Sequence, residues 1–228
     1  GGFLAPAAEP AYCGKKIPAR TFNDTLTASG TLACDGRPTH AVYGFAMMLK
    51  ALQEQERPTY LAVAFDVGKP TFRHQQFEAY KIQRKPMPED LIMQIPVIKR
   101  LLAAYRVPIF EREGYEAEDV LATIARRFAA NGVETYLVTG DKDVLQLVNS
   151  HIKVYNPHKE DLVLDAAAVR KRYGIGPERM VDLMALMGDA IDNIPGVPGI
   201  GEKTAVALLQ RFGSLDNLYR HLDELESP

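Results

Sequence analysis

The feature that most constrains this chain is the stretch 114–143, where carboxylates gather around one helical and one extended segment. Glu116 and Asp119 stand three residues apart at the start of an amphipathic pattern, so a helix places them on one face. The apolar run VETYLVTG follows the turn signal Asn131-Gly132 and predicts a buried strand. The five carboxylates of the stretch are Glu116, Glu118, Asp119, Asp141 and Asp143.

This stretch predicts a metal site. Asp141 and Asp143 follow the carboxyl end of the predicted strand, which is where parallel α/β sheets place their ligands. The start of a helix favours some negative charge, but five converging carboxylates would repel one another strongly without a cation. Oxygen ligands with no Cys or His nearby indicate a hard ion, Mg²⁺ or Mn²⁺.

A second strand is also expected to end in an acid. A helical pattern begins at Thr39 and ends before Arg57-Pro58. The run YLAVAF that follows predicts a short strand ending in Asp66. Two separate strands that each deliver a carboxylate strengthen the prediction of one shared site.

Basic and aromatic residues are interleaved in the segment KPTFRHQQFEAYKIQRKPMPEDL. On a single helix, spacings of four, four and three residues would form one stripe of Arg73, Phe77, Lys81 and Arg84, flanked by His74, Tyr80 and Lys85. Such a stripe suits a sugar-phosphate backbone with exposed bases. A solvated amphipathic helix with a cationic face explains it equally well.

The C-terminal third adds another acidic pair. Pro177 opens a helical pattern whose methionines we assign to core packing. Asp189 and Asp192 lie at the end of this predicted helix, three residues apart. Since carboxylates there oppose the helix dipole, they need a cation or a solvated terminal turn, and the pair alone does not choose between these.

The last motif, IPGVPGIGEKTAVALLQRFGSLDNL, predicts two helices around a glycine-rich turn. Glycines allow a phosphate to approach the backbone closely, and the N–H groups that open a helix can bind it. The Gly-Lys-Ser/Thr signature of nucleotidase phosphate loops, with its preceding strand, is absent. We therefore predict a clamp for a duplex backbone, built from Gly196, Gly199, Gly201, Lys203 and Thr204.

Composition is compatible with a nucleic-acid partner despite a net charge of −2. Setting aside the eight carboxylates assigned to metal leaves 27 basic and 21 acidic residues, a balance of +6 outside the site. No apolar run of about 18 residues exists, so we expect no membrane span. Cys13 and Cys34, the only cysteines, are expected to be free thiols in a reducing cytoplasm.

Taken together, the motifs resemble the 5′-nuclease domain at the amino end of bacterial DNA polymerase I, in the flap-endonuclease superfamily. The resemblance runs from about Asp35 to the end, through AVYGF, AVAFD, TFRH, GYEAED, TGDKDVLQLV, GDAIDNIPGVPGIGEKTA and FGSLDNL in the family order. It implies an α/β fold with a central, mostly parallel sheet flanked by helices, a helical arch and a C-terminal helix-hairpin-helix subdomain. The expected divisions are an unmatched segment 1–30, a core with arch at 31–172, and a DNA-binding subdomain at 173–228.

The resemblance also implies roles for individual residues. A first metal cluster would be Asp66, Glu116, Glu118 and Asp119, and a second would be Asp141, Asp143, Asp189 and Asp192. Catalytic cations of the arch would be Arg73, Lys81 and Arg84, with His74 among the DNA contacts. The family holds two Mg²⁺ or Mn²⁺ ions, and its helix-hairpin-helix turn, here with Lys203, can also bind K⁺.

The sequence departs from the family pattern at two points. Glu118 stands where the family has an aspartate, and before Asp35 no apolar strand delivers an acid. We expect a monomeric, cytoplasmic 5′-3′ exonuclease and flap endonuclease that acts on flap, nicked or 5′-ended DNA; the sequence leaves open whether a polymerase domain follows Pro228. The rivals are a flap-binding module that cuts poorly for want of the first ligand strand, and a phosphohydrolase of small phosphoesters.

Overall fold

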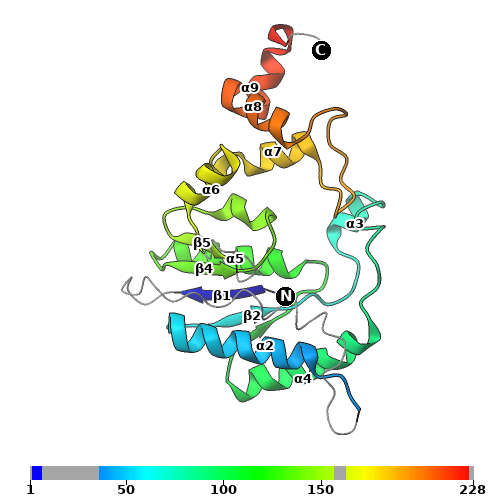
Figure 1. The fold of residues 1–228 in the computed structure, drawn as a ribbon, viewed down its shortest axis with the longest axis vertical. Helices are drawn as coiled ribbons and strands as arrows, with labels where there is room; N and C mark the ends of the chain where they lie inside the picture. The colour runs from blue at the N-terminus through cyan, green and yellow to red at the C-terminus, as the bar shows by residue number, and fades with distance from the viewer. Residues whose placement is uncertain (1, 7–35, 157–162, 226–228) are drawn as a thin grey trace.

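A six-stranded sheet forms the centre of the computed structural model, which describes residues 2–6, 36–156 and 163–225 (Figure 1). The strand order is β3-β2-β1-β4-β5-β6. The strands are β1 (Gly2–Pro6), β2 (Ala62–Ala64), β3 (Ile109–Phe110), β4 (Thr135–Val138), β5 (Ile152–Tyr155) and β6 (Val163–Leu164). Four of them run in one direction, whereas β1 and β6 run in the opposite direction.

The sheet differs from the expected one in two respects. It is mixed rather than mostly parallel, because β1 is antiparallel to both of its neighbours and β6 to β5. The first thirty residues do contain a strand, since Leu4 of β1 pairs with Ala62 on one side and Leu137 on the other. The sequence did not predict β1 because five residues, from Gly2 to Pro6, are too few to show the alternation of a strand. The partners of β1 are also strands far along the chain.

The strand β1 is present, but it supplies no carboxylate to the metal site. Residues 2–6 include no acid, and because β1 runs against β2 and β4, its end points away from the edge where Asp66 and Asp141 follow their strands. The other features expected before Gly36, including Cys13 and Cys34, lie outside the described residues.

Two hydrophobic layers cover the two faces of the sheet, as the alternation of strand side chains requires. On one face, α2 (His40–Ala51) and α4 (Glu89–Ala104) pack against Val63 and Val138. On the other, α5 (Ala117–Ala129) packs against Leu137 and, with α6 (Ala166–Tyr173), forms the larger core. A π-helical turn, η1 (Leu52–Glu56), extends α2.

Most predicted helices are confirmed. Thr39 directly precedes α2, and Glu89 is the first residue of α4. Asp165 caps α6 by accepting a hydrogen bond from the Ala168 N–H at 2.8 Å, and Gly174 ends that helix at φ +74°.

The predicted helical stripe from Arg73 to Arg84 is wrong. The helix there, α3 (Phe72–Gln76), stops at Phe77, whose φ of −144° is extended. Lys81 adopts φ +54° and donates its backbone N–H to the Asp192 carbonyl at 3.0 Å. A hydrogen bond to a residue 111 positions away thus replaces the helical one, which local spacing does not reveal.

The C-terminal helices extend away from the sheet, toward the top of Figure 1. They are η3 (Pro177–Arg179), α7 (Met180–Met187), α8 (Glu202–Phe212), α9 (Leu215–Arg220) and η4 (Leu222–Glu224). Two helices, α7 and α8, do flank the glycine-rich turn, whereas Asp189 and Asp192 lie in the loop beyond α7. No helix within the described ranges has both the length and the apolar character needed to cross a membrane.

Candidate metal centre

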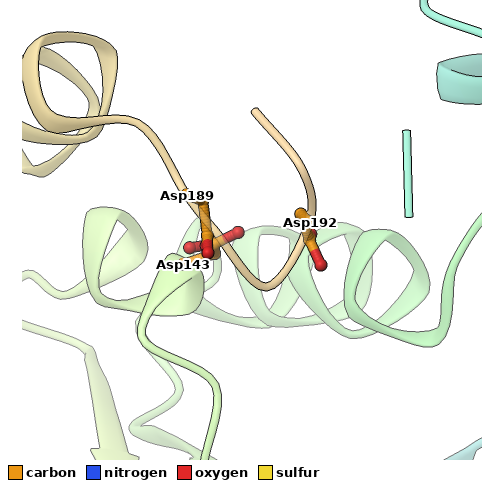
Figure 2. A group of neighbouring side chains, drawn as sticks. All are labelled: Asp143, Asp189 and Asp192. Atoms are coloured by element: carbon orange, nitrogen blue, oxygen red, sulfur yellow. The ribbon is translucent and has the colours of Figure 1, made fainter. Parts of the chain in front are cut away.

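Three aspartates from distant parts of the chain converge beside the carboxyl edge of the sheet. Asp143 opens the 3₁₀ helix η2 (Asp143–Leu147) shortly after β4, and Asp189 and Asp192 come from the loop after α7 (Figure 2). One carboxylate oxygen of each lies within 4.8 Å of the others. Of the eight predicted ligands, these three are the ones that the structure brings into one tight group.

The loop 189–194 owes its shape to backbone contacts. Asp189 and Ile194 exchange two backbone hydrogen bonds, of 2.9 and 2.8 Å, which close a tight hairpin around Asp192. Gly188 and Gly196 lie so close that a Cβ on Gly196 would sit 2.3 Å from the Met187 carbonyl carbon. Gly196, predicted as a phosphate contact, therefore has a packing role that allows this hairpin to form.

The group carries more negative charge than its surroundings neutralise. Burial, and then the charges of Asp141, Asp189 and Asp192, raise the pKa of Asp143 to about 6. The buried Oδ1 of Asp143 has no hydrogen-bond partner among the described residues. The Lys142 Nζ lies 3.3 Å from Asp189 and offsets part of the charge. An oxygen-rich, under-neutralised group with an orphaned acceptor fits a hard divalent cation.

Two more predicted ligands line the same cleft. Its volume is about 640 Å³, and Glu118 and Asp141 border it together with the three aspartates. Burial raises the pKa of Glu118, and the charges of Asp66 and Asp141 add to the effect. Asp141 accepts the Asp143 N–H at 2.8 Å. Five of the eight predicted carboxylates therefore face one cleft.

Asp66 is held at the edge of this group. Its Oδ1 accepts the N–H of Ala117 at 2.8 Å, which ties the residue after β2 to the first turn of α5. The prediction that β2 delivers a carboxylate toward α5 is consistent with this contact.

The remaining pair, Glu116 and Asp119, is bound to cations of the protein itself. Arg73 donates two hydrogen bonds of 2.7 Å to Asp119, and the Lys81 Nζ lies 2.7 Å from Glu116. Burial is the largest single effect and would raise the pKa of Asp119. The hydrogen bonds from Arg73 and the Glu116 backbone, together with the charges of Arg73 and Lys81, nevertheless leave that pKa lowered. The two acids do share a face at the start of α5, as predicted, and close a capping box there.

Tyr80 and Asn193 link the two acidic groups; the sequence placed Tyr80 only on the flank of the basic stripe and gave Asn193 no role. The Tyr80 hydroxyl lies 3.1 Å from Glu116 Oε1 and 3.0 Å from Asp192 Oδ2. The Asn193 side-chain amide donates to the Ala79 carbonyl at 2.8 Å and accepts from Gln83 at 3.1 Å. These contacts hold residues 79–83 against the acidic loop. The one available signal was that Tyr80 adjoins Lys81; for Asn193 we find none.

The other predicted residues lie farther from the cluster. His74 accepts the Thr71 N–H through Nδ1 at 3.1 Å and packs edge-on against Tyr80, and Arg84 is exposed. Lys203 and Thr204 are exposed in the first turn of α8, after Gly201 and the left-handed Gly199. Their neighbour Glu202 borders the acidic cleft, so the start of α8 lies close to it.

Comparison with known proteins identifies the family. A family model described as "5'-3' exonuclease, N-terminal resolvase-like domain" matches residues 14–174, and a second, "5'-3' exonuclease, C-terminal SAM fold", matches residues 175–228. The first match begins inside the segment 1–30.

Relatives of known identity agree with these matches. DNA polymerase I of Bacillus caldotenax is 47% identical over 84% of this chain, which spans only 22% of that protein. The 5′-3′ exonuclease of Aquifex aeolicus is 41% identical over 84% of this chain and 66% of its own length. Among solved structures, the bacteriophage T5 flap endonuclease in complex with DNA and metal ions matches with a TM-score of 0.66 and 22% identity, covering 84% of this chain and 72% of the other. The chain therefore belongs to the 5′-3′ exonuclease family, as the domain found in bacterial DNA polymerase I.

Proposed function

We propose that this chain is a divalent-metal-dependent 5′-nuclease that hydrolyses DNA phosphodiester bonds at 5′ ends and flaps. The observation that carries the proposal is the convergence of Asp143, Asp189 and Asp192 within 4.8 Å, in a cleft that Glu118 and Asp141 also line. Family membership supports it, and the T5 structure contains DNA and metal ions.

The carboxylates divide into two candidate ligand sets. One is Asp141, Asp143, Asp189 and Asp192; the other is Glu118 with Asp66 and the shared Asp141. When bound, two divalent ions would activate a water and stabilise the leaving oxygen.

The basic residues would position the phosphate beside this cleft. Lys81 lies 3.6 Å from Asp192 as well as contacting Glu116, so its charge borders both acidic groups. Arg73 is oriented by its two bonds to Asp119. Positive groups placed in advance near a reacting phosphate offset the charge that develops there. We assign the same role to Arg84 and a DNA-contact role to His74.

The turn before α8 would hold duplex DNA. Gly199, Gly201, Lys203 and Thr204 present exposed backbone and side-chain donors at the start of an 11-residue helix, which favours an anion. We also propose that this turn binds a K⁺ ion and that the boundary between the core and the clamp lies near residues 172–173. A polymerase domain elsewhere in the same protein is a further part of the proposal.

A second function, flap binding with little cleavage, is favoured by one specific observation. The strand in the middle of the sheet supplies no acid, and two predicted ligands, Glu116 and Asp119, are paired with Lys81 and Arg73. Breaking these pairs to admit a metal would cost binding energy.

A 5′-labelled flap substrate separates the two functions. With Mg²⁺ or Mn²⁺, we expect a short labelled product from the wild type and at least a hundredfold less from the double variant Asp143→Asn with Asp189→Asn. Glu54→Gln, an exposed acid paired with Lys50 far from the cleft, is the matched control and should cut normally. Binding without product by the wild type at excess enzyme would favour the binding module.

A further inference from the structure

A second cavity, of about 400 Å³, adjoins the acidic cleft. It shares with that cleft the side chains of Lys142, Asp143, Asp189 and Asp192. The cavity extends from there between α3 and the exposed side of α7. Its volume lies within the range of about 300–1,000 Å³ typical of small-molecule sites.

The wall away from the acids is apolar and accessible. Its side chains are Phe77, Val181, Ala185 and Ile194, whereas Met180 and Met184 also line the acidic cleft and connect the two cavities. Phe77 is 38% exposed, Val181 54% and Ile194 37%, so these groups meet solvent around one hollow. A ligand that covers these side chains would bury apolar surface, which is favourable. We therefore expect the ligand of this cavity to be partly apolar.

Polar groups border the rest of the cavity. The amides of Gln76 and Gln146 can both donate and accept hydrogen bonds, and Arg73 and Lys142 contribute positive charge. A flat group with two apolar faces and a polar edge would match this combination. A simple phosphate would not, because one whole wall offers it no partner.

We propose that this cavity receives one unstacked nucleobase of the DNA, from a nucleotide adjoining the phosphate held at the acidic cleft. The inference rests on the proposed nuclease function and adds a base subsite to it. In a nucleotide, one sugar separates the base from the phosphate. Because the cavity and the acidic cleft share side chains, they are close enough for one nucleotide to place its phosphate in the cleft and its base in the cavity. Phe77 supplies the stacking surface, and since every base has such a face, the subsite accepts any base.

The subsite also accounts for where α3 ends. Phe77 leaves the helix in an extended conformation, and the chain then turns to bring Tyr80 and Lys81 onto the acids. A continued helix would point Phe77 elsewhere. The interruption that breaks the predicted stripe thus leaves an aromatic side chain in the lining of the cavity.

The test combines a protein variant with a substrate lacking one base. Flap substrates carry an abasic residue at one of the two nucleotides flanking the scissile phosphate, and kcat/KM is measured for the wild type, Phe77→Ala and Phe77→Tyr. We expect the abasic residue at one of these positions, and Phe77→Ala on the intact substrate, each to lower kcat/KM about tenfold. For Phe77→Ala acting on the abasic substrate, the loss in kcat/KM should stay near tenfold. Phe77→Tyr should have the wild-type kcat/KM on the intact substrate.

Controls keep a fold defect from imitating this pattern. Tyr60→Ala removes another exposed aromatic, 63% accessible and remote from the cavity, and should leave both substrates unaffected. Two results would overturn the base subsite and leave the nuclease proposal intact. One is that the losses in kcat/KM from Phe77→Ala and from the abasic residue multiply when the two are combined. The other is that the wild type cuts the intact substrate and both abasic substrates equally well. Failure of the wild type to cut any intact flap would instead overturn the proposed function.

Discussion

At the scale of single residues, Asp143 shows the conflict between stability and metal binding most directly. Its half-buried carboxylate lies beside three other acids, its buried Oδ1 lacks a partner among the described residues, and its pKa rises to about 6. A group selected only for stability would not be charged at such a position. The arrangement makes sense if a cation completes it.

Asp143→Asn is expected to stabilise the metal-free protein at neutral pH. Raising this pKa from 3.8 to about 6 costs roughly 3 kcal/mol at neutral pH, and solvent screening of the partly exposed side chain reduces that cost. Removing the charge should therefore raise the free energy of unfolding by on the order of 2 kcal/mol. Urea unfolding in EDTA at pH 7.5 measures it. Mg²⁺ should raise the Tm of the wild type and have little effect on the variant; an equal rise in both would place the ion elsewhere.

The same carboxyl predicts a pH dependence. Folded Asp143 keeps its proton up to about pH 6, whereas an unfolded aspartate loses it near pH 3.9. The folded state therefore binds more protons in this window, and the free energy of unfolding contributed by Asp143 should fall as pH rises from about 4 to 6. Unfolding in EDTA across this range, for wild type and Asp143→Asn, isolates the contribution as the difference between the two curves.

At the scale of elements, two short segments without regular structure hold the site together. The hairpin 189–194 carries Asp189 and Asp192, and residues 77–83 carry Tyr80 and Lys81. The two segments are joined by hydrogen bonds from the Lys81 N–H and the Tyr80 hydroxyl to Asp192. The Asn193 side chain adds two more, because its amide NH₂ donates to Ala79 and its amide oxygen accepts from Gln83. The geometry of the cations over the acids depends on this docking.

Gly196→Ala should disrupt the hairpin. Its new Cβ would meet the Met187 backbone at 2.3 Å, and overpacking of this kind costs about 1–3 kcal/mol. Gly201→Ala is the matched control, since its φ of −93° is ordinary and no atom lies within 4 Å of the added Cβ. Thermal unfolding compares them, and equal stability of the two variants would contradict the close packing.

Asn193→Gly should release residues 77–83 without straining the loop. Asn193 has φ +57°, which glycine adopts freely, so the variant removes only the amide contacts. We expect trypsin to cleave after Lys81 or Arg84 about tenfold faster than in the wild type. Asn131→Gly, which also deletes an amide bound to a backbone carbonyl, is the control. Unchanged cleavage in Asn193→Gly would show that the amide does not hold the segment.

At the scale of the whole molecule, the strand at the amino end is central to the sheet. β1 joins the β3–β2 half, which Asp66 follows, to the β4–β5–β6 half, whose strand β4 leads into residues 139–143 of the acidic cleft. Residues 2–6 therefore align Asp66 with Asp141 without supplying a ligand of their own.

Leu4→Pro should consequently be far more harmful than Val163→Pro. Proline removes a backbone donor, which a central strand tolerates poorly and an edge strand such as β6 better. Circular dichroism during heating should show a loss of cooperative unfolding in the first variant and a modest fall in Tm in the second. A similar Tm for both would mean that β1 contributes little to joining the halves.

Local sequence patterns were enough to locate the acids, the strands that precede Asp66 and Asp141, the helix that begins beside Glu116, and the family. Asp66 after β2, Asp143 after β4 and the capped start of α5 were all predictable, because apolar periodicity and capping reflect contacts within about four residues. Long-range packing, in contrast, sets which acids lie beside one another and which lie beside cations. The pairing of Arg73 with Asp119, the bond from Lys81 to Asp192 and the insertion of β1 between two distant strands join residues tens of positions apart or more. Such contacts depend on how all the elements pack at once, and no local pattern encodes them.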